Sequence, residues 1–577
     1  MSSVESAAPL PAGADVHWIL PNVSESIVDS LSRAICVSRL MARILVLRGL
    51  GDPAAAHAFL NMSAHRLSDP MLLQDMEAAV TRIIEALKKR ERILIYGDYD
   101  VDGVCSLVIL YKAIELLGGR VSYCVPHRLE GYGMREEVIA RAAKKGIALV
   151  ISVDTGIRAH DVVRQASRLD LDIIVTDHHL PDAELPSALA VLNPNRADCA
   201  YPNKQLCGAG LAFQLVRGLL IRSKLSRARK QQLLESFLKP AAIATIADVV
   251  SLAGENRILV ARGLSGMKNV SNPGLAALLA TAGIEPGEAP SAQDVAFRIA
   301  PRVNAAGRMA TAKHAVELML TGDAGRAVEL ARKLDHLNAD RQKTEREIVE
   351  FILGSSEAVD NGKSGLVFYA ADWHPGVLGI VASRLVEHFY RPVFVLTDAS
   401  RRPGFIAGSG RSIPAFHLVE ALESISDLFI QFGGHQQAAG VTLSSDRLEE
   451  FRCRFAALAA KRITGEMLHK CVSVDAEVCF EELTDETARE VLSLGPFGHD
   501  NPTPLLVSRR VTAGRVKPLR GGKHFRVQLS QSDRVFWCNA WNFRDRMDLL
   551  EPGALLDVLF HIEEDSFSRR HGSSPGV

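Results

Sequence analysis

Acidic and histidine side chains gather in three short segments in the first third of the chain. They are Asp98, Asp100 and Asp102 in GDYDVDG, Asp154 in DTG, and Asp177, His178 and His179 in DHH. Carboxylates packed together cannot all stay ionised without a nearby cation, because each raises the pKa of the others. Oxygen-rich ligation with one or two imidazoles suits Mn²⁺ or Mg²⁺ better than zinc. We therefore expect two divalent metal ions, which in such pairs lie ~3.5–4 Å apart and clamp a phosphate for hydrolysis.

Each of these segments follows a predicted β-strand. Strands are expected at residues 92–96, 121–125, 148–153 and 171–176, separated by helices that include 104–117 and 136–145. Continuous apolar strands alternating with amphipathic helices predict an α/β, doubly wound parallel sheet. The carboxyl ends of such strands share one edge, where ligands bind. If GDYDVDG is still extended, its alternation points all three aspartates the same way.

Each cluster also has a simpler interpretation. A single Asp after a strand is usually a helix cap or a turn residue, and a His-His pair is more often at the surface. Three clusters at successive strand ends of one sheet are hard to explain by capping. The set therefore favours a metal site.

The 577 residues suggest roughly three to five domains. We expect an N-terminal lead-in with a small helical segment (1–67), a first α/β domain (68–325), a connecting helix (326–353), a second, smaller α/β domain (354–464), a C-terminal β-barrel (465–564) and a disordered tail (565–577). The segment 326–353 has neither Gly nor Pro, and its middle is polar. That pattern predicts a long helix that is packed at its ends and solvated between them.

Composition excludes several classes. The 67 basic residues balance 67 acidic ones, and 47% hydrophobic with 23% charged residues is typical of a soluble globular protein. No apolar run reaches the ~18 residues of a membrane span. Nine scattered cysteines without a CxxC pair argue against disulfides and structural zinc and for a reducing compartment. The N-terminus lacks a signal-peptide pattern, so we expect a cytoplasmic protein without membrane contact.

At this point the residues resemble a known family. DYDVDG, DTG, DHH and Asp248 in ATIADVVSL match, in order, the motifs of the DHH phosphoesterase superfamily, and within it the RecJ family of single-strand-specific 5′→3′ exonucleases. The resemblance runs from about residue 68 to 564 and includes VLNPN, PRVNAAGRM, WHPGVLGIVASRL, GSGRS, GGHQQAAG and LGPFGHDNPTP. DHH alone is a weak signal, whereas the ordered set is specific. One departure is Thr155, where many relatives have Asn, but this position is not an expected ligand.

The resemblance implies roles for the acidic cluster. The implied metal ligands are Asp100, Asp102, Asp154, His178 and Asp248. Asp154 would bridge the ions, His179 would contact the scissile phosphate, and Asp177 would orient His178. Asp98 matches an acidic family position whose part, ligand or support, stays open.

A second set of residues is predicted to bind substrate. They are Arg128, Tyr132, Arg302, Asn304, Arg308, Ser409, Arg411, Ser412, Gly433, Gly434 and His435. Arg128 and Tyr132 follow the second strand, where Arg suits a phosphate and Tyr suits a sugar or base, and matching positions in relatives hold the 5′ end. Arg411 and Ser412 are expected in a glycine-rich loop whose N–H groups favour anions. The alternative is that a lone Arg is usually a solvated or salt-bridged surface residue.

The C-terminal region carries a basic run. Residues 509–526 contain seven Lys or Arg residues and no acid, with Phe525, Phe536, Trp537 and Trp541 nearby. Basic strands interleaved with aromatics on a small barrel are typical of an OB-fold that follows single strands. The simpler interpretation is a solvated face.

The resemblance implies an enzyme that degrades single-stranded DNA 5′→3′ to 5′-mononucleotides, in repair and recombination. Single-stranded DNA is the expected partner, a single-strand-binding protein and a helicase are further candidates, and we expect a monomer. One alternative is a DHH phosphodiesterase acting on short oligonucleotides or cyclic dinucleotides, although such relatives lack the region after residue 465. Another is a catalytically inactive single-strand-binding scaffold, which degraded motifs would mark.

Overall fold

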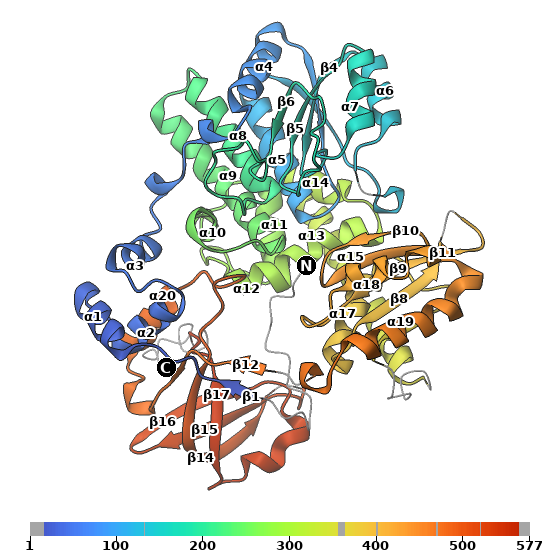
Figure 1. The fold of residues 1–577 in the computed structure, drawn as a ribbon. Helices are drawn as coiled ribbons and strands as arrows, with labels where there is room; N and C mark the ends of the chain where they lie inside the picture. The colour runs from blue at the N-terminus through green and yellow to red at the C-terminus, as the bar shows by residue number, and fades with distance from the viewer. Residues whose placement is uncertain are drawn as a thin grey trace.

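The computed structural model describes residues 17–131, 133–355, 364–399, 402–468, 471–519 and 521–564. Figure 1 shows two α/β domains side by side, with a β-rich domain below them and the N-terminal helices beside that domain. Among the helices of the described residues, none has the combined length and hydrophobicity needed to cross a bilayer.

The first α/β domain is built on a five-stranded parallel sheet in the order β3-β2-β4-β5-β6. Its strands are β2 (Arg92–Tyr96), β3 (Arg120–Cys124), β4 (Ile147–Val153), β5 (Asp172–Thr176) and β6 (Ala190–Leu192). One face is covered by α4 (Met76–Lys89), α5 (Val101–Leu116), α8 (Gly208–Arg222) and α9 (Arg227–Ala247), and the other by α6 (Glu136–Lys144) and α7 (His160–Arg168). The predicted doubly wound sheet is confirmed, with β6 as an additional strand.

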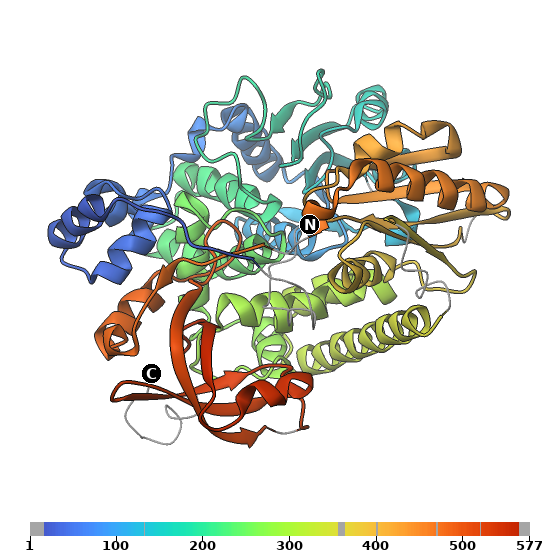
Figure 2. The same cartoon turned by 60° about the horizontal axis from the view of Figure 1, so that its bottom comes forward.

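A helical layer follows the sheet and leads to the second domain. It contains α10 (Gly254–Gly266), α11 (Pro273–Thr281), α12 (Ala292–Asp294), the π-helix η4 (Val295–Ile299), α13 (Ala300–Met309) and α14 (Lys313–Leu320). The connecting helix α15 (Ala324–Leu353) is one continuous element of 30 residues and is clearly seen in Figure 2. Its apolar residues are buried at both ends and most of its middle is exposed, as predicted, but one face of the middle is covered, where the buried Asn338 and Glu345 engage Arg341.

The second α/β domain has a five-stranded mixed sheet in the order β10-β11-β9-β8-β7. Its elements are β7 (Leu366–Tyr369), α17 (Leu378–Phe389), β8 (Val393–Asp398), β9 (Phe405–Arg411), α18 (Leu418–Glu423), β10 (Phe429–Gly434), β11 (Ala438–Ser444) and α19 (Leu448–Arg462). The expected glycine-rich loop around Arg411 is wrong, since GSGR forms the end of β9. Its glycines permit close packing: a Cβ at Gly410 would lie 2.4 Å from the Phe394 ring.

The C-terminal β domain and the N-terminal helices form one unit. The strands β13 (Ala476–Glu477), β14 (Leu506–Pro518), β15 (Phe525–Gln531) and β16 (Arg534–Ala540) are consecutive in the sheet, and β17 (Leu555–Phe560) pairs with β14. The helices α1 (Glu25–Ile35), α2 (Arg39–Leu47) and α3 (Pro53–Leu60) contribute to the same hydrophobic core, together with α20 (Asp485–Ser493). The N-terminal region also joins this unit through β1 (His17–Ile19), which pairs in parallel with β12 (Cys471–Ser473).

Candidate metal centre

The carboxyl ends of β2, β4 and β5 bring the three acidic segments together. Their donor atoms form three overlapping groups, each within 4.8 Å: Asp98, Asp100 and Asp154; Asp102, His178 and Asp248; and Asp154, His178 and His179. We call these seven residues the metal centre. Asp154 and His178 each belong to two groups, an arrangement that suits two cations sharing ligands.

His178 lies at the middle of this centre. Its Nε2 atom is 3.1 Å from Asp154 Oδ1, and 3.7 Å from both Asp102 Oδ2 and Asp248 Oδ2. Asp248 lies at the C-terminal end of α9 and not at the end of a strand. Its place in the centre therefore depends on helix packing as well as on strand order.

The GDYDVDG segment turns into a helix earlier than predicted. Asp100 is the N-cap of α5, and its Oδ1 accepts a hydrogen bond from Gly103 N at 3.0 Å. Asp102 lies in the first helical turn, so the extended alternation expected for this segment is wrong. Capping and metal ligation are compatible at Asp100, because a carboxylate has two oxygens and the cap uses one.

Backbone amides hold Asp102. Gly208 N and Ala209 N, at the N-terminus of α8, donate to its two carboxylate oxygens at 2.5 and 2.7 Å. A helix N-terminus stabilises negative charge. A Cβ at Gly208 would lie 2.7 Å from Asp154 Cβ, so only glycine fits between the two carboxylates. Sequence reasoning missed this glycine, for which the helix start at CGAG was the available signal.

Asp177 orients His179, not His178 as the family resemblance implied. Asp177 Oδ1 lies 2.7 Å from His179 Nδ1, and Asp177 Oδ2 accepts a hydrogen bond from Ile157 N at 2.9 Å. Burial opposes charge at both residues, but their mutual hydrogen bond outweighs it, lowering the pKa of Asp177 and raising that of His179. The pair therefore favours a carboxylate beside an imidazolium.

Two asparagines after β6 hold the backbone of the histidine pair. Asn193 Nδ2 donates to His179 O at 2.8 Å, and Asn195 Nδ2 donates to His178 O at 2.7 Å. Asn195 N donates in turn to Asn193 Oδ1 at 2.7 Å. The motif VLNPN was noticed in the sequence, but its contact with both histidines follows only from the β5–β6 pairing.

The raised pKa values of the carboxyl groups indicate that the metal centre favours bound cations. Burial, with the charge of Asp100, raises the pKa of Asp98 to about 8. Burial also raises the pKa values of Asp102, Asp154 and Asp248, and neighbouring carboxylates raise them further. Divalent cations compete with such protons and neutralise the crowded charge. The donor set of carboxylates and imidazole fits Mn²⁺ or Mg²⁺.

Helix α13 carries PRVNAAGRM and packs against GDYDVDG. Asn304 Oδ1 accepts a hydrogen bond from Val101 N at 3.2 Å, so this predicted substrate residue holds the start of α5. A Cβ at Gly307 would lie 2.4 Å from Tyr99 O, which explains the glycine. Arg308 Nη1 donates to Gly376 O, in the second α/β domain, at 3.0 Å.

Four arginines from separate elements gather beside the metal centre. This arginine cluster consists of Arg128, Arg308, Arg341 and Arg411. Burial, followed by the charges of the other three, lowers the pKa of Arg308 to about 9, while Asp100 acts in the opposite direction. Burial and Arg128 lower the pKa of Arg411. Sequence reasoning missed Arg341, because the polar middle of α15 resembled a solvated surface.

Two contacts shape this cluster further. The Arg128 guanidinium lies over the Tyr99 ring, 4.8 Å from its centroid. Ser409 and Arg411 share one face of β9 against the start of α17, where a Cβ at Gly379 would lie 3.0 Å from Arg411 Nη2 and 3.5 Å from Ser409 Oγ. Ser409 therefore lies next to Arg411.

The remaining predicted substrate residues have other surroundings. Arg302 is ion-paired with Asp335 at 2.8 Å. Ser412 is buried, and its Oγ donates to Phe416 O at 2.8 Å. Gly433, Gly434 and His435 belong to the β10–β11 hairpin, where His435 N donates to Ala438 O at 2.7 Å. Tyr132 lies outside the described residues.

Comparison with known proteins adds independent information. Residues 92–245 match the model of the DHH family N-terminal domain, residues 362–461 the DHHA1 domain, and residues 474–572 the RecJ OB domain. A protein from Dickeya dadantii (strain 3937), named single-stranded-DNA-specific exonuclease RecJ, is 38% identical over 90% of this chain and 92% of its own length. The chain belongs to the RecJ family.

Other RecJ proteins align with nearly the whole chain. The RecJ of Bacillus subtilis (strain 168) is 34% identical and aligns with 96% of this chain and 69% of its own length. The crystal structure of RecJ in complex with Mn²⁺ from Thermus thermophilus matches with a TM-score of 0.79 at 29% identity, over 96% of this chain and 77% of that chain. The RecJ relationship therefore covers both α/β domains and the C-terminal β domain.

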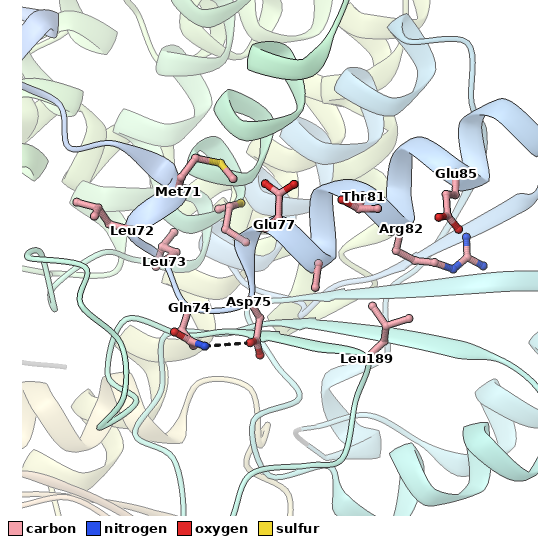
Figure 3. Close-up of a pocket in the computed structure, with 12 residues that line it drawn as sticks. Met71, Leu72, Leu73, Gln74, Asp75, Glu77, Thr81, Arg82, Glu85 and Leu189 are labelled. Carbon is pink, nitrogen blue, oxygen red and sulfur yellow. Dashed lines mark hydrogen bonds between the residues drawn. The ribbon is translucent and has the colours of Figure 1, made fainter.

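A hollow of about 660 Å³ beside α4 is separate from the metal centre (Figure 3). It is lined by apolar side chains such as Leu72 and Leu189 and by the acids Asp75, Glu77 and Glu85. Its cation Arg82 is ion-paired with Glu91 and Asp172. None of the predicted site residues lines it, and its acids do not suit a polyanion.

Proposed function

We propose that this chain is a metal-dependent exonuclease that degrades single-stranded DNA from its 5′ end to 5′-mononucleotides, in DNA repair and recombination. The observation that carries the proposal is a carboxylate-rich metal centre directly beside a half-buried cluster of four arginines. The first suits two divalent cations and the second suits a phosphate. The names of the RecJ relatives support the substrate and the reaction class.

The metal centre would act as follows. Asp100, Asp102, Asp154, His178 and Asp248 would hold Mn²⁺ or Mg²⁺, with Asp154 between the two sites and Asp98 as a further ligand or support. When bound, the ions lower the pKa of water and offset the charge of the scissile phosphate. His179, oriented by Asp177, whose hydrogen bond raises the pKa of the imidazole, would donate a hydrogen bond to a phosphate oxygen.

The arginine cluster would hold the terminal phosphate. Guanidiniums that are desolvated and close together have lost hydration that an anion can replace. Arg128, Arg308 and Arg411 would bind the 5′ phosphate, with Ser409 beside Arg411, and the charge of Arg341 would add to that of Arg308. Anchoring one end at a fixed distance from the metal centre would make each cut release one nucleotide.

The other predicted residues receive different proposals. Asn304 would act indirectly, by holding the start of α5. Gly433, Gly434 and His435 would line the path of the strand at the edge of the second domain. Ser412 and Arg302 would support their own local structure, because Phe416 O and Asp335 already engage them.

The C-terminal β domain would bind the strand farther from the cut. Lys517 Nζ and Arg526 lie 5.1 and 5.8 Å from the centroid of the Trp537 ring. An aromatic ring flanked by cations suits base stacking beside a phosphate backbone. We also propose a cytoplasmic location, which the nine free cysteines support, and a monomeric state. A helicase and a single-strand-binding protein would be partners that supply and present single strands.

A time course on end-labelled strands tests the proposal. Single strands labelled at the 5′ or the 3′ end are incubated with Mn²⁺, Mg²⁺ or chelator, with a matched duplex in parallel. We expect immediate release of labelled mononucleotide from the 5′ end of single strands, and only with metal. Cleavage confined to di- or trinucleotides would favour a short-oligonucleotide phosphodiesterase. A gel shift without cleavage under any metal would favour a binding scaffold.

A further inference from the structure

The loop of residues 494–502 connects the C-terminal β domain with the metal centre. It follows α20 and touches the segment 249–252, which comes directly after Asp248. Leu252 N donates to His499 O at 2.9 Å, and the Leu252 side chain is 1% exposed. A Cβ at Gly498 would lie 2.6 Å from Leu252 Cδ1, so the loop backbone is packed closely against Leu252.

The segment after Asp248 has an unfavourable backbone conformation. Asp248 is the C-cap of α9, and the next residue, Val249, has φ 57°, in the left-handed region. A β-branched residue rarely adopts this region, so the backbone is strained there. Such strain persists only where surrounding contacts hold it. Asn256 Nδ2, which donates to Ser251 O at 3.0 Å, is one such contact, and the 494–502 loop supplies another.

Asn501 gives this loop its shape. It is 1% exposed, and its Nδ2 atom donates to both Leu494 O at 2.9 Å and Pro496 O at 2.8 Å. Its Oδ1 accepts a hydrogen bond from Arg48, whose Nη2 also donates to Pro502 O at 2.7 Å. The two ends of the loop are therefore tied together and to the N-terminal helices through one side chain.

A buried arginine fixes the same loop to the first α/β domain. Arg257, on α10, donates from Nη1 to Leu494 O at 2.7 Å and from Nε to Phe59 O at 3.1 Å. Its guanidinium lies 3.9 Å from the centroid of the Phe59 ring. Helix α10, the N-terminal helices and the 494–502 loop therefore meet at one joint, close to the chain that leaves Asp248.

From these contacts we infer that the 494–502 loop, with Asn501 as its positioning residue, sets the position of Asp248 in the metal centre. The C-terminal β domain then acts on the chemical step as well as on strand binding. This inference rests on the proposed nuclease function and on Asp248 as a metal ligand.

The test compares Asn501→Ala with Gln531→Ala in the full chain. Gln531 is a matched control: its amide accepts from Phe480 N at 2.7 Å and donates to Arg509 O at 2.8 Å, within the β domain alone. The substrate is a 5′-phosphorylated trinucleotide, and Mn²⁺ binding is titrated calorimetrically without substrate. For Asn501→Ala we expect kcat and Mn²⁺ affinity to fall about tenfold, as for other residues that support metal ligands, with KM unchanged.

The outcomes separate the possibilities. Equal kcat and Mn²⁺ affinity in Asn501→Ala and Gln531→Ala would overturn the inference, as would an effect on KM alone. An inactive wild-type chain that still binds Mn²⁺ would instead contradict the proposed function. If Asn501→Ala fails to fold, Gly498→Ala keeps every hydrogen-bonding side chain of the loop and pushes the loop backbone away from Leu252. A smaller loss of kcat and Mn²⁺ affinity in that variant supports the inference, and wild-type values overturn it.

Discussion

The metal centre and the arginine cluster bring charges of opposite sign together in adjoining, partly buried sites, and they differ in how the repulsion within each site is relieved. The carboxylates can take up protons, and burial has already raised the pKa of Asp98 to about 8. The guanidiniums stay charged, since even Arg308 keeps a pKa of about 9, above neutral pH. Under the proposed function, the metal centre would exchange protons for cations, whereas an anion would relieve the repulsion within the arginine cluster.

The two sites also differ in how they are assembled. Every residue of the metal centre comes from the first α/β domain, mostly from the ends of adjacent strands. The arginine cluster combines Arg128 and Arg308 with Arg341 on the connecting helix and Arg411 in the second α/β domain. The ligands for the cations therefore come from one domain, with the 494–502 loop as the inferred support of Asp248, whereas phosphate binding should depend on the placement of two domains.

The strongest test of this contrast is Asp154→Asn. Asp154 has φ 58°, a conformation that asparagine tolerates, so the change removes charge with little backbone strain. We expect hydrolysis to fall at least about 10³-fold, because several kcal/mol of metal-assisted stabilisation is lost. Strand affinity measured by fluorescence anisotropy should stay near wild type. The metal-free variant should also melt higher than metal-free wild type, since one crowded carboxylate is gone; a lower melting temperature would contradict the crowding argument.

The corresponding substitution in the arginine cluster is Arg308→Gln. Losing a charged hydrogen-bonding group in a buried site costs about 1.5–3 kcal/mol, or roughly 10–100-fold in kcat/KM for a 5′-phosphorylated strand. Calorimetric Mn²⁺ affinity should not change. Arg302→Gln serves as the comparison, because Arg302 is paired with Asp335 and should affect stability more than kcat/KM. Equal kinetic losses in both variants would restore the role that the sequence predicted for Arg302.

A smaller effect is expected from Asn195→Ala. The amide that holds His178 O would be lost, and the histidine pair would move relative to Asp154. We expect Mn²⁺ affinity and kcat to fall about tenfold, the lower range for groups that support metal ligands. Asn272→Ala is the control, since Asn272 makes an equivalent amide contact with Met319 O away from the site. Unchanged Mn²⁺ affinity in Asn195→Ala would make VLNPN a purely structural motif.

The difference in how the two sites are assembled also explains which of their features could be predicted from the sequence. Strand order and strand ends are local patterns, so the parallel sheet and the convergence of Asp98, Asp154 and His178 were accessible from periodicity. Arg341 and Gly208 were not, because their roles depend on which elements pack against them. The GSGR segment was misplaced for the same reason: glycines that permit close strand packing look the same in sequence as glycines in a loop. Contacts between domains, such as the hydrogen bond from Arg308 to Gly376 O, produce no periodic pattern in the sequence.

The smallest expected effect is on the pH dependence of thermal stability. The pKa of Asp98 is raised from 3.8 to about 8 in the folded, metal-free protein, so the folded state binds more protons than the unfolded state between these values. The stability that this group contributes is therefore full below about pH 4 and is lost as pH rises towards 8. Mn²⁺ displaces the proton, so the rise in melting temperature caused by Mn²⁺ should be larger at pH 8 than at pH 6. Asp98→Asn should flatten this difference, and a shift that is independent of pH in the wild type would show that the metal centre does not hold protons before it holds cations.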